Sequence, residues 1–529
     1  MVISKRAVQE FMERPMRDST VAKRMDPKKV DRILKEQQAE FLTEPREAQK
    51  VCFLLGWKYE RYLFLLGCGS GKSKLTLDLF RNRRKVGTAK RMLVLVPNIV
   101  NLGAWEQEIQ KHAWDLSCLL VEASGAEARW DQIKSDADVV VITYQGMASL
   151  VSPLAHDRLK GKNKRKMDGK LVDLMGKCFD VLVADECTSI KNPRSLWFKI
   201  LRRFRKTIPS IYGLTGTPFN KSPEDLWSQF LVIDGGETLG ETLGIYREAF
   251  FSEKDNYWGG KEYTFRQSMW RPLSSRLANR SVRYSDEESQ DLPRAVGGLS
   301  NEFMFVPVQL PMTQRPYYRE INEELREAHG NYQLVDNAYT RMRMICSGWL
   351  GAVTETGEKA EVVFNDNPVF DAVMDLIEKI PEEEKIVVVC WFNTTCRLLM
   401  ERIKTAKHKV GLINGKSPRA AKKKAMESFC GEGGIRILVG STAISKGVNL
   451  QAVSRYMIFV ESPDSSLERT QIEKRIHREG GSGRPCYFYD IVARIGRTPT
   501  VHEAILESVK TGRNLHDILI DQKLVKAPV

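Results

Sequence analysis

Short apolar runs recur through most of the chain and constrain its fold more than any other feature. Each run is rich in Val, Ile, Leu and aromatic residues, and a charged, helix-like stretch separates it from the next. Such runs are typical of strands buried on both faces of a parallel sheet built from βαβ units. They occupy residues 62–67, 92–97, 138–144, 180–186, 210–216, 385–392, 408–415, 435–441, 456–462 and 484–492.

The ten runs fall into two groups of five, which predicts an α/β fold with two parallel-sheet lobes and a helical insertion between them. Residues 303–310 form one strand-like segment in the region between the groups. The predicted divisions are an N-terminal helical accessory segment, lobe 1, a mostly helical insertion and linker, and lobe 2. Their ranges are 1–40, 41–235, 236–360 and 361–529.

Composition narrows the classes of protein to consider. The chain has 82 Lys and Arg against 67 Asp and Glu, which gives a net charge of +15. Such a charge favours an anionic partner such as nucleic acid. The alternative is a soluble basic protein that has no such partner. No segment approaches the roughly 18 consecutive apolar residues that a membrane span needs. The ten cysteines show no C-x-x-C pair or zinc-ligand spacing, so we expect a reduced, cytoplasmic setting and no structural metal.

A glycine-rich segment, GCGSGKS at 67–73, follows the first predicted strand and precedes a predicted helix. Glycines allow backbone N–H groups to face a phosphate chain, the lysine can reach the β- and γ-phosphates, and the serine hydroxyl can bind Mg²⁺. Leu66 replaces the first glycine of the full motif. The alternative is a glycine-rich turn that happens to contain a lysine. The predicted phosphate-binding residues are Gly67, Cys68, Gly69, Ser70, Gly71, Lys72 and Ser73.

An acidic pair, Asp185 and Glu186, ends the strand-like run 180–186. An acid at a strand end can hold Mg²⁺, and the acid beside it can activate an attacking water. The alternative is a surface pair of acids, but the buried strand before it favours the metal and catalytic roles.

With these segments in place, the sequence resembles superfamily 2 helicases and, within them, the SNF2-like (Swi2/Snf2) DNA-dependent ATPases of compact bacterial or phage type. DECT at 185–188 stands where the family has a DEAD/DEAH-like box, with Thr188 in place of its histidine. Gly481 likewise replaces a family glutamine. The matching segments are PREAQ at 45–49, LVPNIVNLGAWEQEIQK at 95–111, VITYQ at 141–145, LTGTPFNKSPEDLW at 214–227, GVNLQ at 447–451, QIEKRIHREGG at 471–481 and TVHEAI at 500–505.

The resemblance implies two RecA-like lobes that use ATP and Mg²⁺ and close on the nucleotide. It implies that Ser73 and Asp185 hold Mg²⁺ and that Arg475 and Arg478 reach the γ-phosphate from lobe 2. For the other sites it implies adenine contacts at Arg46 and Gln49, coupling at Thr215, Gly216, Thr217, Gly447 and Gln471, and nucleic-acid contacts at Trp105, Thr143, Asn192 and Thr442. Core packing is an equal alternative for Trp105.

The resulting hypothesis is a motor that hydrolyses ATP on binding nucleic acid and translocates on duplex DNA, with single-stranded DNA or RNA as alternative partners. One rival is a strand-separating superfamily 2 helicase, and another is an ATP-switched DNA clamp or adaptor without translocation. The basic run 158–170 is either an additional phosphate-binding loop or a solvated linker.

Overall fold

The computed structural model describes residues 4–511 except 68, 158–161, 220–221, 256–260, 286–287, 289–291, 328–331, 354–358, 432–433, 446–449 and 479–482. The chain divides into two units, Met1–Gln290 and Asp291–Val529. This division falls inside the stretch 236–360 that we expect to be an insertion, so the four-part organisation remains a prediction.

The first unit is built on a seven-stranded sheet in which every pairing is parallel. All five predicted runs of this unit form strands, and two short strands, β3 and β11, extend the sheet at its edges. In spatial order the strands are β11 (Ser281–Tyr284), β1 (Arg61–Leu66), β8 (Ser210–Thr215), β7 (Val181–Asp185), β2 (Met92–Val96), β4 (Val139–Thr143) and β3 (Cys118–Leu120).

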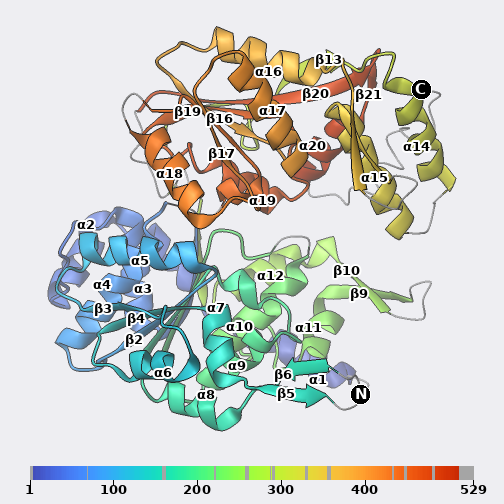
Figure 1. The fold of residues 1–529 in the computed structure, drawn as a ribbon. Helices are drawn as coiled ribbons and strands as arrows, with labels where there is room; N and C mark the ends of the chain where they lie inside the picture. The colour runs from blue at the N-terminus through green and yellow to red at the C-terminus, as the bar shows by residue number, and fades with distance from the viewer. Residues whose placement is uncertain are drawn as a thin grey trace. The chain divides into compact units, whose positions relative to one another are not determined.

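Alternate residues of each strand enter one of two cores, which explains why the runs are apolar throughout. In β1, Leu63 and Leu65 join one core, whereas Phe64 and Leu66 join the other. The core that contains Phe64 and Leu66 also includes residues of helices α2 (Pro27–Glu36), α3 (Glu47–Lys58), α4 (Lys72–Lys85) and α5 (Ile99–His112). The core that contains Leu63 and Leu65 includes residues of helices α6 (Ala126–Lys134), α7 (Tyr144–Val151), α8 (Gly169–Gly176), α9 (Leu196–Phe204), α10 (Leu226–Asp234), α11 (Leu243–Phe250) and α12 (Trp270–Leu277) (Figure 1).

The N-terminal segment is helical, as expected, and it packs on the first unit. Phe11 of α1 (Lys5–Glu13) is buried with its ring centroid 6.4 Å from that of Phe250. Ser19, which begins the 3₁₀ turn η1 (Ser19–Arg24), shares a 2.5 Å hydrogen bond with the Tyr62 hydroxyl. These contacts make the segment a structural part of the first unit.

Two antiparallel hairpins in this unit were not expected. The first pairs β5 (Leu154–Asp157) with β6 (Lys162–Arg165), so residues 162–165 of the basic run form a strand and neither a flexible loop nor a linker. Residues 158–161 lie outside the described residues. The second hairpin pairs β9 (Phe251–Asp255) with β10 (Lys261–Phe265), in a stretch whose composition suggests helix.

The second unit is built on an eight-stranded sheet that is parallel except where β21 meets β20. The five predicted runs and the segment at 303–310 all form strands. The path runs β12 (Ala295–Val296), β20 (Cys486–Ile495), β19 (Ser454–Phe459), β16 (Lys385–Val389), β18 (Ile437–Gly440) and β17 (Val410–Ile413), and β20 also pairs with β13 (Met304–Gln309) and β21 (Thr498–Pro499).

Helices cover both faces of this second sheet (Figure 1). One core takes α16 (Pro368–Lys379) and α17 (Asn393–Thr405), and the other takes α18 (Arg419–Cys430) and α19 (Ser466–Glu473). A third core joins α14 (Arg315–Glu327), α15 (Tyr332–Cys346) and α20 (Val501–Thr511), and the hairpin of β14 (Trp349–Val353) and β15 (Lys359–Val363) follows α15.

The α/β class with two parallel-sheet units is thus confirmed. Parallel strands place their carboxyl ends at one edge of a sheet, and ligands bind at that edge. Strands β1, β8 and β7 are neighbours in the first sheet, so the segments that follow them meet there. Among the described helices, none combines the length and the apolar character of a membrane span.

Candidate active site

The loop between β1 and α4 has the backbone geometry of an anion site. Gly69 and Gly71 adopt positive φ angles of 85° and 74°, and Gly71 caps the N-terminus of α4. A Cβ atom on Gly71 would lie 2.0 Å from Gln49 Nε2, so only glycine fits at this position. The backbone N–H groups at a helix N-terminus and the dipole of the helix both favour a bound phosphate.

Lys72 is the first residue of α4, and its ammonium group contacts the start of this loop. Its Nζ donates to the carbonyl oxygens of Leu66 (3.1 Å) and Gly67 (2.9 Å). Ser70 Oγ also donates to the Gly67 oxygen at 2.8 Å, which closes the loop on itself. Glycine backbone, helix N-terminus and ammonium group together fit the phosphate chain of a nucleotide.

Arg46 and Gln49 brace this loop from α3, a role that the sequence did not indicate. Gln49 Nε2 donates to the carbonyl oxygens of Ser70 (3.1 Å) and Gly71 (3.2 Å), and Arg46 Nη1 donates to that of Gly69 (3.2 Å). Gln49 Oε1 accepts the Arg46 backbone N–H at 2.9 Å, in a capping box at the start of α3. Their contact with adenine stays a prediction.

Asp185 ends β7 and has its carboxylate held on both oxygens. Oδ2 accepts the indole N–H of Trp105 at 2.9 Å, and Oδ1 accepts the backbone N–H of Glu186 at 3.0 Å. The Tyr144 hydroxyl donates to the Asp185 carbonyl oxygen at 3.0 Å. Desolvation and the neighbouring Glu186 charge raise the pKa of Asp185 to about 6, against the opposing effects of Trp105 and Lys72. An acid that Lys72 influences electrostatically suits a metal beside the phosphate loop.

Glu186 occupies the left-handed backbone region, with φ of 47°, where non-glycine residues are uncommon. Such strained residues cluster at functional sites. Thr215 Oγ1 donates to Glu186 Oε2 at 3.4 Å and accepts the backbone N–H of Thr217 at 3.1 Å. A Cβ on Gly216 would lie 3.1 Å from the Leu66 carbonyl oxygen. The turn after β8 therefore touches both the acid and the phosphate loop.

The structure corrects the assignment of Trp105 to nucleic acid. Its side chain is only 2% exposed and packs in the core beside α4, so its ring offers no surface to a strand. The core alternative is right, and the bond to Asp185 adds a link to the site. Thr143, at the end of β4, caps α7 through the Gly146 N–H (2.9 Å), and exposed Asn192 accepts the Arg194 N–H (2.8 Å). Their nucleic-acid role stays a prediction.

The remaining predicted residues lie in the second unit. Thr442 begins the 3₁₀ turn η5 (Thr442–Ser445) after β18, and Gln471 lies on α19. Arg475 and Arg478 follow α19, and both are partly exposed. The Arg475 carbonyl oxygen accepts the Leu450 N–H at 3.0 Å, in the segment next to Gly447. Gly447 itself, like Cys68 in the first unit, lies outside the described residues.

A buried arginine that the sequence did not single out fixes the position of α19. Arg469 is fully buried, and its guanidinium pairs with Asp490 of β20 at 2.6 Å and with Glu473 at 2.7 Å. These ion pairs anchor the helix that leads to Arg475 and Arg478. No local signal distinguishes this arginine from a solvated one in sequence.

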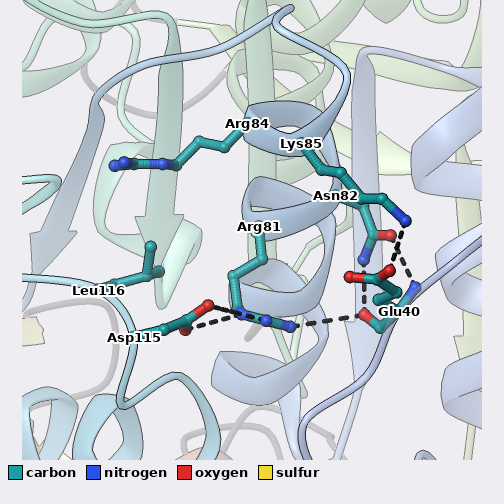
Figure 2. A pocket seen from close by; sticks show the side chains of 7 residues that line it. All are labelled: Glu40, Arg81, Asn82, Arg84, Lys85, Asp115 and Leu116. Atoms are coloured by element: carbon teal, nitrogen blue, oxygen red, sulfur yellow. Dashed lines mark hydrogen bonds and ion pairs between the residues drawn. The ribbon is translucent and has the colours of Figure 1, made fainter.

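A cavity of about 300 Å³ lies along the C-terminal half of α4, away from the phosphate loop (Figure 2). Arg81 is nine positions after Lys72, which corresponds to about 13 Å of helix. The basic side chains that line the cavity already have carboxylate partners. Arg81 pairs with Asp115 at 2.8 Å, Lys85 with Glu40 at 2.5 Å, and Arg84 with Asp138. This cavity is therefore no second phosphate site.

Comparison with known proteins agrees with this site. Residues 67–274 match the model of the SNF2-related domain, and residues 368–480 match that of the helicase conserved C-terminal domain. The chain is 24% identical over 479 residues to "Putative protein p41" of Acyrthosiphon pisum secondary endosymbiont phage 1, covering 86% of this chain and 93% of that protein. It is 21% identical over 464 residues to "Putative ATP-dependent helicase/translocase YwqA" of Bacillus subtilis, covering 86% of this chain but 46% of that larger protein.

Two solved structures are also similar. One is the Sulfolobus solfataricus SWI2/SNF2 ATPase core in complex with dsDNA, at 19% identity and a TM-score of 0.40, with 92% of this chain and 96% of that chain covered. The other is the Pyrococcus furiosus Hef helicase domain, at 15% identity and a TM-score of 0.49, with 88% and 98% covered.

Proposed function

Because the chain belongs to the SNF2-like ATPases of helicase superfamily 2, we propose that it couples ATP hydrolysis to movement along duplex DNA. Membership makes it an ATP hydrolase of the helicase/translocase kind. We propose further that the protein moves on duplex DNA and does not separate its strands. The observation that carries it is the convergence of the phosphate loop, the acidic pair and the Thr215 turn at the ends of three adjacent strands.

Each residue of this site has a role in phosphoryl transfer, which depends on positioning and charge neutralisation. The loop N–H groups and Lys72 would hold the phosphates, and Ser73 and Asp185 would hold Mg²⁺. When bound, Mg²⁺ neutralises charge on the β- and γ-phosphates. Glu186, oriented by the Thr215 hydroxyl, would accept a proton from the attacking water.

Arg475 and Arg478 would complete the site from the second unit when the two units close on ATP. An arginine finger contributes on the order of 10³–10⁵ in rate, so closure would switch hydrolysis on. In this proposal Thr215, Gly216, Thr217, Gly447 and Gln471 couple closure to the nucleic-acid side.

The proposed DNA contacts are to phosphates. The net charge of +15 favours an anionic polymer. Thr143 ends β4, Asn192 follows the 3₁₀ turn η2 (Cys187–Ile190) after β7, and Thr442 begins η5 after β18. Phosphate contacts of this kind are sensitive to salt and indifferent to sequence. A cytoplasmic setting, in a bacterial or phage-infected cell, suits this partner.

The decisive experiment measures the steady-state ATPase rate alone and with duplex DNA, single-stranded DNA or RNA, beside a Lys72→Ala control. We expect strong stimulation by duplex DNA that the control lacks, and displacement of a triplex-forming strand in a second assay. Stimulation by single strands or RNA alone would instead favour a strand-separating helicase. A low rate under every condition would favour the ATP-switched clamp.

A further inference from the structure

The only polar atom of the Trp105 side chain is committed to the acidic pair. Trp105 lies in the middle of α5, and its ring packs in the same core as Val94, Val96 and Leu102. Its Nε1 donates to Asp185 Oδ2 at 2.9 Å. A buried N–H needs a partner, so the bond holds the ring and the carboxylate to each other.

The other contacts of Asp185 leave Trp105 as the side chain that sets the plane of the carboxylate. Oδ1 accepts the backbone N–H of Glu186 at 3.0 Å, and Tyr144 donates to the main-chain oxygen. The described contacts of Oδ2 include no side-chain donor except the indole. Without it, rotation about the Cβ–Cγ bond of Asp185 would be less restricted.

We propose that Trp105 is a positioning residue for the divalent cation, because its indole N–H orients the Asp185 carboxylate toward the metal–nucleotide complex. This inference rests on the proposed function. An indole suits the task because it donates one bond, carries no charge and is buried in the core. Partners that orient a metal-binding carboxylate typically change metal affinity or activity by about 10- to 100-fold when they are removed.

The chain offers a matched control. Trp227 is also buried, with 6% of its surface exposed, and its Nε1 donates to the Gly240 carbonyl oxygen at 2.9 Å. Trp227→Phe therefore removes a buried indole bond of the same length in the same unit without touching Asp185. Asp185→Asn serves as the positive control for loss of the metal.

The test measures two affinities of the full-length protein: that of a fluorescent ADP analogue in EDTA, and that of Mn²⁺ for the protein–ADP complex by electron paramagnetic resonance. For Trp105→Phe we expect unchanged ADP affinity in EDTA and a Mn²⁺ dissociation constant raised about 10-fold. Trp227→Phe should match the wild type in both measurements.

Unchanged Mn²⁺ affinity in a folded Trp105→Phe protein would overturn the inference, and so would equal losses in Trp105→Phe and Trp227→Phe. If Trp105→Phe fails to fold, benzothienylalanine at position 105 replaces only the N–H by sulfur and keeps the ring shape, and the same rise in the Mn²⁺ constant is expected. A wild-type protein that binds no ADP would instead overturn the proposed function itself, and an unaffected Asp185→Asn would overturn the metal role of Asp185.

Discussion

Single residues in the candidate site are held by contacts that restrict each of them to one orientation. Glu186 keeps a left-handed backbone and receives the Thr215 hydroxyl, and Lys72 bonds to two loop carbonyls. A side chain restricted in this way loses little entropy when the reaction geometry forms. The proposed function assigns nucleotide binding to Lys72 and proton transfer to Glu186, so the two roles can be tested separately.

Glu186→Gln tests that separation. The amide keeps the size of the side chain but cannot accept a proton from water, so kcat should fall on the order of 10²–10⁴-fold while nucleotide affinity is retained. Rapid-quench ATPase measurements and titration with a fluorescent ATP analogue check both effects. Glu427→Gln, on α18 of the second unit, is the control, and a Glu186→Gln protein with normal kcat would exclude Glu186 as the base.

A second residue-scale prediction concerns pH and stability. Burial and the nearby Arg343 charge lower the pKa of His502 from 6.5 to about 3. The folded protein thus keeps His502 neutral. The contribution of this neutral side chain to folding stability is fully present well above pH 6.5. As the pH falls, the unfolded chain takes up a proton that the folded chain refuses, and the loss is about 2 kcal/mol between pH 6.5 and pH 5.

Urea unfolding at pH 7.5, 6.5 and 5 measures this dependence, with His502→Gln as the comparison. The variant cannot titrate in this range, so its stability should vary less with pH than that of the wild type. Parallel pH curves for the two proteins would show that His502 does not cause the loss.

At the scale of elements, the N-terminal helices behave as part of the first unit. Phe11 packs on Phe250 and under Arg276, whose guanidinium lies 4.0 Å from the Phe11 ring centroid, and Val30 and Leu34 of α2 are buried. Ser19 and Tyr62 tie η1 to β1. The segment thus links the helices after β8 to the opposite face of the sheet.

Phe11→Ala should lower the free energy of unfolding of the first unit by about 3 kcal/mol, because it removes a buried aromatic side chain and leaves a cavity. Val21→Ala, at a position that is 56% exposed, should have little effect. Chemical denaturation of both variants followed by circular dichroism makes the comparison. Equal midpoints would mean that α1 contributes nothing to the stability of the unit.

At the scale of the whole molecule, the proposed function assigns hydrolysis to residues of both units. Lys72 and the acidic pair lie in Met1–Gln290, whereas Arg475 and Arg478 lie in Asp291–Val529. Hydrolysis would then depend on an encounter between units, but nucleotide binding would not. This difference distinguishes an ATPase that needs both units for hydrolysis from one in which the first unit hydrolyses ATP by itself.

Arg478→Ala should therefore leave ATP affinity nearly unchanged and reduce DNA-stimulated ATPase activity on the order of 10³-fold. Arg484→Ala, which lies near the start of β20 and pairs with Glu384 at 3.0 Å, is a matched control that should keep most activity. Normal stimulated activity in Arg478→Ala would remove this arginine from the mechanism.

The strands, the phosphate loop and the acidic pair were predictable because their signals are local. A buried parallel strand needs an apolar run, and a phosphate loop needs glycines before a helix. The edge strands β3 and β11 were not predictable, because short strands depend on a neighbour for pairing. The same holds for the two hairpins of the first unit, whose charged residues resemble helix or linker.

Local pattern by itself thus determined the two-unit α/β architecture and the position of the glycine loop after β1 and of the acidic pair at the end of β7. Only the tertiary structure decided that Trp105 is buried against Asp185, that Gln49 and Arg46 brace the phosphate loop, and that Arg469 anchors α19. The physical reason is that these are contacts between residues distant in the chain or hidden by burial. Burial and partner choice are properties of the packed fold, and no short window of sequence contains them.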